Sequence, residues 1–194
     1  MQNKKIKNLK TEVLSDNWYT LNKVTFEYQK TDGNWQTQKR EVYERGHGAA
    51  VLLYNLEKKT IILICQLRIP TYIQGHSTGM MVEVCAGLLD GDTPEVCMIR
   101  EVEEETGLRI PKVEKVFEAY MSPGAVTEKI HFFIAPYTDH MRVSNGGGLA
   151  TEHEDIEVLE LTFKEALTML SNGTIVDAKT IMLLQYAQLN GVLG

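Results

Sequence analysis

Three glutamates near the middle of the chain stand at a spacing that could bind a metal ion. Glu101, Glu104 and Glu105 are three and four positions apart, so a helix would place their carboxylates on one face. Like charges at this spacing destabilise an exposed helix by roughly 0.2–0.5 kcal/mol per pair, so stability alone does not select them. Hard divalent cations with oxygen ligands, Mg²⁺ above all, would neutralise the cluster and leave water positions open to phosphate oxygens. The alternative is a solvated acidic helix face, because most runs of charge are exposed surface.

The acidic residues around this cluster account for the formal charge of the whole protein. Residues 86–108 hold seven Asp or Glu and one Arg, a net charge of −6, and the full chain of 194 residues also has a net charge of −6. This balance argues against nucleic acid, and against an anionic membrane surface, as a partner.

The acidic segment is predicted to form a helix with well-defined ends. Asp92 or Thr93 can cap its N-terminus, Pro94 suits the first helical position, and Gly107 suits the left-handed residue that ends a helix. Apolar residues at a spacing of three lie on a different face from the glutamates, at Val96, Ile99 and Val102. The helix would therefore pack through one face and present its carboxylates on another.

The rest of the chain predicts the elements that would hold this helix in place. Strands are expected at residues 18–28, 36–43, 49–54, 60–68, 81–85, 113–120, 129–137 and 157–161, and amphipathic helices at 162–171 and 178–190. Strands mixed with helices indicate an α/β fold with α/β/α layers, preceded by an N-terminal β unit. The glycine-rich residues 144–148 predict a mobile loop.

Length and composition predict the number of domains, the cellular compartment and the state of the cysteines. A chain of 194 residues with 43% apolar content suffices for one domain of some size with a small appendage. The N-terminus lacks the pattern of a signal peptide, and no apolar run approaches the roughly 18 residues of a membrane span, so we expect a cytoplasmic protein without a membrane partner. The three cysteines lack paired spacing, and we expect them to be buried free thiols.

The acidic helix is similar to the second half of the Nudix box. Residues 100–108 read Arg-Glu-Val-Glu-Glu-Glu-Thr-Gly-Leu and match the pattern Arg-Glu-apolar-x-Glu-Glu-x-Gly-apolar throughout, so the chain resembles the Nudix hydrolase family. The first half departs from the pattern, because the interval from Gly87 to Arg100 is one residue short. The family glutamate that braces the arginine therefore corresponds to Thr93 or to Asp92, and a shortened loop favours Asp92.

Stretches across nearly the whole chain are also similar to one branch of this family, the bacterial GDP-mannose pyrophosphatases. They are residues 39–43, 45–48, 84–90, 120–124 and 155–160. The resemblance implies a Nudix-type α/β/α sandwich with a mixed sheet, in which residues 1–45 form a β unit that contributes to a dimer and residues 46–194 form the hydrolase domain. It also implies a Mg²⁺-dependent homodimer that hydrolyses GDP-mannose, a nucleotide sugar, to GMP and mannose 1-phosphate.

The same resemblance implies which residues carry the reaction. The metal ligands would be the backbone carbonyl of Ala86 and the side chains of Glu101, Glu105 and Glu154, and the three glutamates would also be catalytic. Glu154 would help to orient or deprotonate the attacking water. Glu152 competes with it because the loop is longer than in the family, and Glu128 is a third candidate for the general base.

Substrate contacts are implied along most of the chain. They are Trp18, Lys39, Arg40, Glu41, Arg68, Ala86, Gly87, Leu88, Glu105, Glu128, His153, Glu154 and Lys179. Of these, Lys39, Arg40 and Arg68 could neutralise phosphate oxygens, and Trp18 offers an aromatic face to a base. Taken singly, such a Lys or Arg is more often a solvated surface charge, and Trp18 could equally pack in a core or a dimer.

Two other functions are compatible with these features. An ADP-ribose or ADP-sugar pyrophosphatase would share the box and differ in its base and sugar pockets. A non-catalytic nucleotide-sugar sensor would keep the fold without the chemistry, although the intact set of Glu101, Glu104 and Glu105 argues against it. Turnover of GDP-mannose and of ADP-ribose separates the two enzymes, and tight binding without a Mg²⁺-dependent product would identify a sensor.

Overall fold

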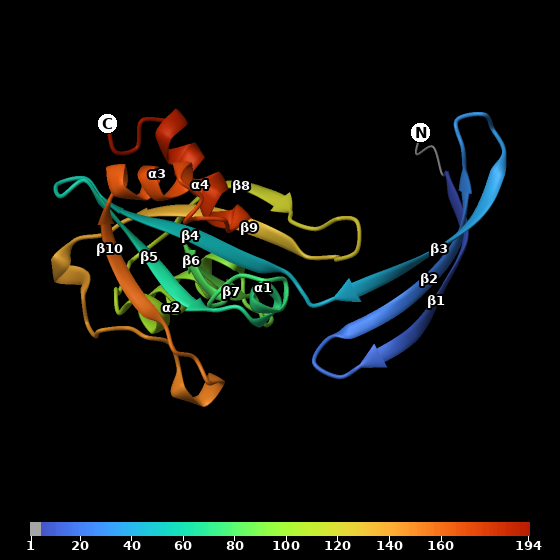
Figure 1. Cartoon of the computed structure of the whole chain (residues 1–194), viewed down its shortest axis with the longest axis horizontal. Coiled ribbons are helices and arrows are strands. Elements are labelled where there is room, and N and C mark those ends of the chain that lie inside the picture. Colours follow the sequence, from blue (N-terminus) through green and yellow to red (C-terminus); the bar gives the residue numbers. More distant parts are fainter. Residues whose placement is uncertain (1–4) are drawn as a thin grey trace. The chain divides into compact units, whose positions relative to one another are not determined.

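The computed structural model describes residues 5–194, and the chain divides into two compact units (Figure 1). The first unit comprises the chain through His47 together with Tyr120–Lys129, and the second comprises Gly48–Ala119 and Ile130–Gly194. Each unit has its own sheet.

The first unit is built on a three-stranded antiparallel sheet. Its strands are β1 (Ile6–Asp16), β2 (Thr20–Gln29) and β3 (Trp35–Glu44), paired in that order. The two strands predicted in this region are confirmed as β2 and β3, and in their turn the Asp32 carboxylate accepts a hydrogen bond from the Asn34 N–H at 2.9 Å. The sequence did not predict β1, because its apolar residues do not alternate regularly and nearly all its side chains are exposed.

The second unit contains a seven-stranded mixed sheet in the order β10-β5-β4-β9-β8, with β6 paired to β5 and β7 paired to β4. The strands are β4 (Gly48–Asn55), β5 (Thr60–Leu67), β6 (Met80–Glu83), β7 (Cys85–Leu88), β8 (Glu114–Tyr120), β9 (Lys129–Pro136) and β10 (Glu157–Thr162). Strands β4 and β9 run parallel, whereas β5 is antiparallel to β4, β6 and β10. The predicted hairpin of two buried strands is confirmed as β4 and β5.

Helices cover both faces of this sheet (Figure 1). On one face α2 (Pro94–Thr106) packs against β7 and β4, and on the other α3 (Phe163–Ser171) contacts β10 while α4 (Ala178–Leu189) contacts β4. The predicted α/β/α layering is therefore confirmed. Shorter helices lie in the connections, at α1 (Ile69–Ile73), η1 (Asp139–Met141) and η2 (Ala150–Glu152). None of the helices in residues 5–194 is long and apolar enough to span a membrane.

The ends of α2 are those that its sequence predicts. Thr93 is the N-cap, and its hydroxyl accepts a hydrogen bond from the Val96 N–H at 3.4 Å. Pro94 occupies the first turn, and Gly107 ends the helix with a left-handed φ of 72°. The open choice of cap between Asp92 and Thr93 is thus decided for Thr93.

The cysteines are free thiols, as expected. Cys85 and Cys97 are buried, whereas Cys65 is only half-buried. Cys97 belongs to the core between α2 and the sheet, together with Met98, Val102 and Phe133.

Candidate active site

Glu101 and Glu105 lie on the face of α2 that packs against β7. A Cβ at Gly87 would overlap the carboxyl group of Glu101, so the strand has to carry glycine here for the glutamate to lie against it. Glu105 is 2% exposed, and its Oε2 accepts a hydrogen bond from the Ala86 N–H at 3.3 Å. Strand β7 therefore places Ala86, Gly87 and Leu88, all predicted site residues, beside the α2 carboxylates.

These carboxylates are held where ionisation is unfavourable. Burial raises the pKa of Glu105 to about 8, and the negative charges of Glu101 and Glu154 act in the same direction. Burial likewise raises the pKa of Glu101 to about 7, although the charge of Arg100 opposes this shift. A cation among the carboxylates would relieve the repulsion, so an oxygen donor set of this kind fits a hard divalent metal.

The carboxylates do not form a closed metal cage. Within residues 5–194, no group of three or more His, Cys, Asp or Glu side chains has the spacing of a completed metal site. Mg²⁺ does not need one, because it is usually held by one or two carboxylates and completes its shell with waters and substrate phosphates. The buried oxygens and their raised pKa values therefore fit a hard divalent cation.

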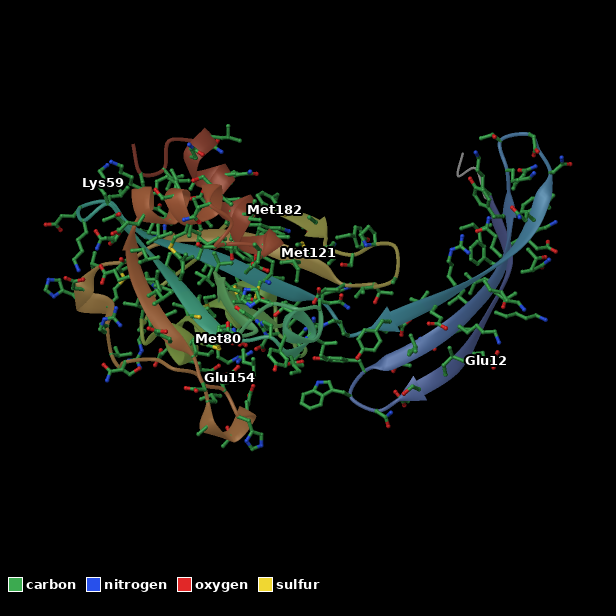
Figure 2. The ribbon with its side chains drawn as sticks, viewed as in Figure 1. Glu12, Lys59, Met80, Met121, Glu154 and Met182 are labelled. Carbon is green, nitrogen blue, oxygen red and sulfur yellow. The ribbon has the colours of Figure 1, made fainter. Side chains whose placement is uncertain are left out.

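Glu154 reaches this position because a glycine-rich segment docks on the C-terminal end of α2. Gly147 and Gly148 donate backbone hydrogen bonds at 2.9 and 3.1 Å to carbonyls in the last turn of the helix. The Glu154 carboxylate then accepts a hydrogen bond from the Leu149 N–H at 2.9 Å (Glu154 is labelled in Figure 2). Residues 144–148 form a loop, as predicted, and these bonds give partners to carbonyls that a helix end leaves unpaired.

The two acids proposed for the loop differ in their surroundings. Glu154 is half-buried, and its charge contributes to the raised pKa values of Glu101 and Glu105. Glu152 and His153 are exposed at the surface of the segment. The geometry therefore groups Glu154, rather than Glu152, with the α2 carboxylates.

Arg100 is held chiefly by glutamates of its own helix. Its guanidinium contacts Glu104 at 2.8 Å and Glu101 at 3.0 Å, whereas Asp92 lies 3.6 Å away. The sequence favours Asp92 as the residue that braces Arg100, but in the structure the contact between Arg100 and Asp92 is the longest of the three. Glu104 thus takes the shortest contact with the arginine.

Two cations of the predicted substrate set lie in the same unit as the carboxylates. Arg68 forms an ion pair with Glu83 at 2.7 Å, and Lys179 contacts Asp177 at 2.7 Å and lies 4.0 Å from Glu83. Sequence reasoning missed both acids. The available signals were an acid inside an apolar strand, which needs a partner, and an acid directly before a helix, which suits a cap.

The other predicted contacts belong to the first unit. Trp18 is 85% exposed at the turn between β1 and β2, and residues 39–41 are exposed on β3. The Glu128 side chain is 13% exposed and pairs with Arg45 at 3.4 Å. The structure thus brings together the α2 carboxylates, β7, Glu154 and two cations in the second unit, and holds these remaining residues in the first.

Comparisons with known proteins identify relatives of both parts of the chain. The family model of the NUDIX domain matches residues 44–184, and the model described as the GDP-mannose pyrophosphatase NudK N-terminal domain matches residues 5–43. Proteins named GDP-mannose pyrophosphatase from Shigella dysenteriae serotype 1 (strain Sd197) and Escherichia coli O157:H7 are each 52% identical over 185 residues, which cover 95% of this chain and 96% of theirs. One of the same name from Escherichia coli O139:H28 (strain E24377A / ETEC) is 53% identical over 180 residues, 93% of each chain.

Proposed function

The chain belongs to the Nudix family, and we propose that it hydrolyses the diphosphate bond of a nucleotide sugar, GDP-mannose, to give GMP and mannose 1-phosphate. The observation that carries the proposal is the pair of carboxylates, Glu101 and Glu105, that α2 packs against β7, with the charge of Glu154 acting on both. The names of the relatives, which match over nearly the full length of both chains, support GDP-mannose as the substrate.

The proposed metal is Mg²⁺, held by Glu101, Glu105, Glu154 and the carbonyl of Ala86. When bound, the ion would offset the charge of the diphosphate and lower the pKa of a coordinated water. The chain itself contributes a buried, water-poor position in which such charges interact strongly. The raised pKa values of Glu101 and Glu105 support the choice of ligands, because both carboxylates gain from a nearby cation.

We propose Glu154 as the residue that orients or deprotonates the attacking water. Its support is that it is half-buried and that its charge acts on both Glu101 and Glu105, since a general base has to lie near the metal ligands to reach the water. Glu152 is exposed and Glu128 is paired with Arg45, so each is a weaker candidate.

The substrate would be held by cations and by an aromatic face. Arg68 and Lys179 are proposed to bind diphosphate oxygens, and Trp18, which is exposed, to stack on the base. The remaining proposed contacts are Lys39, Arg40, Glu41, Gly87, Leu88, Glu128 and His153. Residues 39–41 are exposed, so a ligand can reach them, although the Arg40 guanidinium already donates hydrogen bonds to Lys39 and Gln38.

We further propose that the protein acts as a homodimer in the cytoplasm, with residues 1–45 contributing to the dimer and residues 46–194 forming the hydrolase domain. Exposed apolar side chains support a dimer, because patches of this kind mark interfaces. In the first unit they include Ile6, Leu9, Val13 and Leu14, and Ile6 and Leu9 line an open apolar cleft of about 670 Å³ together with Val24 and Phe26. In the second they are Leu67, Ile69, Tyr72 and Ile73. Leu9→Asp is expected to shift the mass measured by light scattering toward the monomer.

Product analysis in ¹⁸O-labelled water tests the reaction. GDP-mannose incubated with Mg²⁺ and the protein should give GMP and mannose 1-phosphate, and the label identifies the phosphorus that the water attacks. Faster turnover of ADP-ribose than of GDP-mannose would reassign the substrate. Tight binding of GDP-mannose with no Mg²⁺-dependent product would make the protein a sensor instead.

A further inference from the structure

Glu83 has no role in the reaction proposed above, yet it fixes a cation of the substrate site. It lies at the end of β6, is 3% exposed, and accepts hydrogen bonds from Arg68 on both carboxylate oxygens. The Arg68 Nε lies 3.1 and 3.2 Å from the two oxygens, and Nη2 lies 2.7 Å from one of them. Two-pronged pairing of this kind sets the plane of a guanidinium as well as its position.

Asp177 fixes the second cation with one of its two oxygens. Its Oδ1 accepts a hydrogen bond from Lys179 Nζ at 2.7 Å, and its Oδ2 accepts from the Thr180 N–H at 2.9 Å and from the Thr180 hydroxyl at 2.7 Å. The Thr180 hydroxyl in turn accepts from the Val84 N–H at 2.8 Å. The first turn of α4 is therefore bonded to the chain between β6 and β7, directly before the strand that lies beside the α2 carboxylates.

Arg68, held in this way, remains available to an anion. The Arg68 side chain is 40% exposed, and within residues 5–194 no hydrogen bond engages its Nη1. Burial lowers the pKa of Arg68, but the bond to Glu83 and the charges of Glu83 and Glu105 raise it by more. The guanidinium is therefore within electrostatic reach of the α2 carboxylates while part of it still faces solvent.

We propose that Glu83 and Asp177 are positioning residues that hold Arg68 and Lys179 as a paired cationic subsite for the diphosphate oxygens. The inference rests on the proposed function and adds two residues to it. A diphosphate carries more negative charge than a metal ion held by carboxylates can neutralise. Cationic side chains fixed beside the metal position would neutralise the rest and so strengthen substrate binding. Side chains already held in place lose less conformational entropy when the ligand binds. The two acids do not touch the substrate and act through the cations.

Asp177→Asn separates this role from helix capping. Asparagine caps a helix about as well as aspartate but has no charge with which to hold Lys179. We expect KM for GDP-mannose to rise about tenfold, because Lys179 loses the charged partner that holds it, while kcat changes less than about threefold. The midpoint of thermal unfolding should stay within about 2 °C, because the cap is kept. Glu83→Gln, which keeps the shape of the side chain, should also raise KM.

A double-mutant cycle tests whether Asp177 acts through Lys179. In the Lys179→Ala background, Asp177→Asn should change KM by less than about twofold, because its target is gone. Additive effects of the two substitutions on KM would overturn the inference. A lowered unfolding midpoint with unchanged KM would also overturn it, since the acids would then be purely structural.

Glu103→Gln is the matched control. It breaks another two-pronged pair on the same chain, between Glu103 and Arg109, whose shortest contact is 2.6 Å and whose side chains are exposed. Its KM should equal that of the wild type, and a rise equal to that of Asp177→Asn would overturn the inference.

A failure of the proposed function can be distinguished from a failure of the inference. The wild type is first assayed with GDP-mannose and with ADP-ribose, and KM is followed on whichever it cleaves. If it cleaves neither, the proposed function fails, and calorimetry with inorganic pyrophosphate and Mg²⁺ tests the subsite. Weaker binding by Asp177→Asn than by the wild type would then support the subsite, whereas equal or absent binding would overturn it.

Discussion

Two charged clusters in the second unit are built in opposite ways. Glu83 and Asp177 each have a cation at 2.7 Å, so that cluster is balanced without a ligand. Around Glu105, burial raises the pKa of the carboxyl and the charges of Glu101 and Glu154 raise it further, so an added cation would stabilise that cluster. The difference separates a cluster whose charges satisfy one another from a cluster that an added cation would stabilise, as the proposed metal site requires.

The unbalanced cluster works against stability. Buried carboxylates that repel one another destabilise the folded state, and a protein that kept them without a function would gain by losing them. In the balanced cluster, removal of one partner destabilises the folded state, because it leaves a buried charge unpaired. Substitutions in the two clusters should therefore move activity and stability in different combinations.

The largest expected effect comes from Glu105→Gln. Loss of the central carboxylate should lower kcat with GDP-mannose and Mg²⁺ by about 10²–10³-fold or more, a loss typical of a group that stabilises transition-state charge. The fold should be kept, and in the presence of a chelator the unfolding midpoint should equal or exceed that of the wild type, because a buried like charge is gone. Unchanged turnover would reject the assignment of the acidic helix as the metal site.

Gly87→Ala tests the same cluster without changing its charge. The added Cβ would overlap the Glu101 carboxyl and push it away from β7, so kcat should fall about 10–10²-fold. Far-ultraviolet circular dichroism should show the native fold, and the stability loss should be about 1–3 kcal/mol, as for other overpacked positions. A variant with wild-type kcat would mean that the place of Glu101 against the strand does not matter for the reaction.

The pH dependence of stability in metal-free protein sharpens the comparison further. The pKa values of Glu101 and Glu105 are raised from 4.5 in the unfolded reference to about 7 and about 8 in the folded state. The folded state thus binds more protons over this range, so the stability contribution of these groups is present below about pH 4.5 and is lost as pH rises toward 8.

Thermal unfolding between pH 5 and 8.5 with a chelator measures this loss as a falling midpoint. The decline should be shallower for Glu105→Gln and should be reduced by Mg²⁺, which binds the ionised carboxylates. The same slope in the variant and the wild type would mean that Glu105 does not carry the effect.

The smallest effect is expected at Glu103, which lies on α2 between the reactive glutamates. Its exposed carboxylate pairs with Arg109 at 2.6 Å, and this hydrogen bond lowers its pKa rather than raising it. Glu103→Gln should leave kcat/KM unchanged and move the unfolding midpoint by no more than about 2–4 °C. A loss of activity comparable to that of Glu105→Gln would show that exposure does not separate the acids of this helix.

Local sequence signals predicted much of this molecule. The ends of α2 follow from Thr93, Pro94 and Gly107, and the core strands β4 and β5 follow from their apolar runs, because caps and periodicity act over a few residues. The sequence did not predict strand β1, because this strand is stabilised by pairing with β2 and has no buried apolar face of its own. The glycines at 146–148 predicted a loop, but not the hydrogen bonds that Gly147 and Gly148 donate to carbonyls at the end of α2.

By itself, the sequence determined the acidic helix, the spacing of Glu101 and Glu105 on it, and the layered α/β class. Only the tertiary structure decided that Glu154 rather than Glu152 joins those carboxylates, and that Glu83 and Asp177 hold the two cations. The physical reason is separation along the chain. Arg68 and Glu83 are 15 positions apart, and Val84 and Thr180 are 96 positions apart. Partners so distant meet only through the packing of the sheet and its helices, which no local pattern encodes.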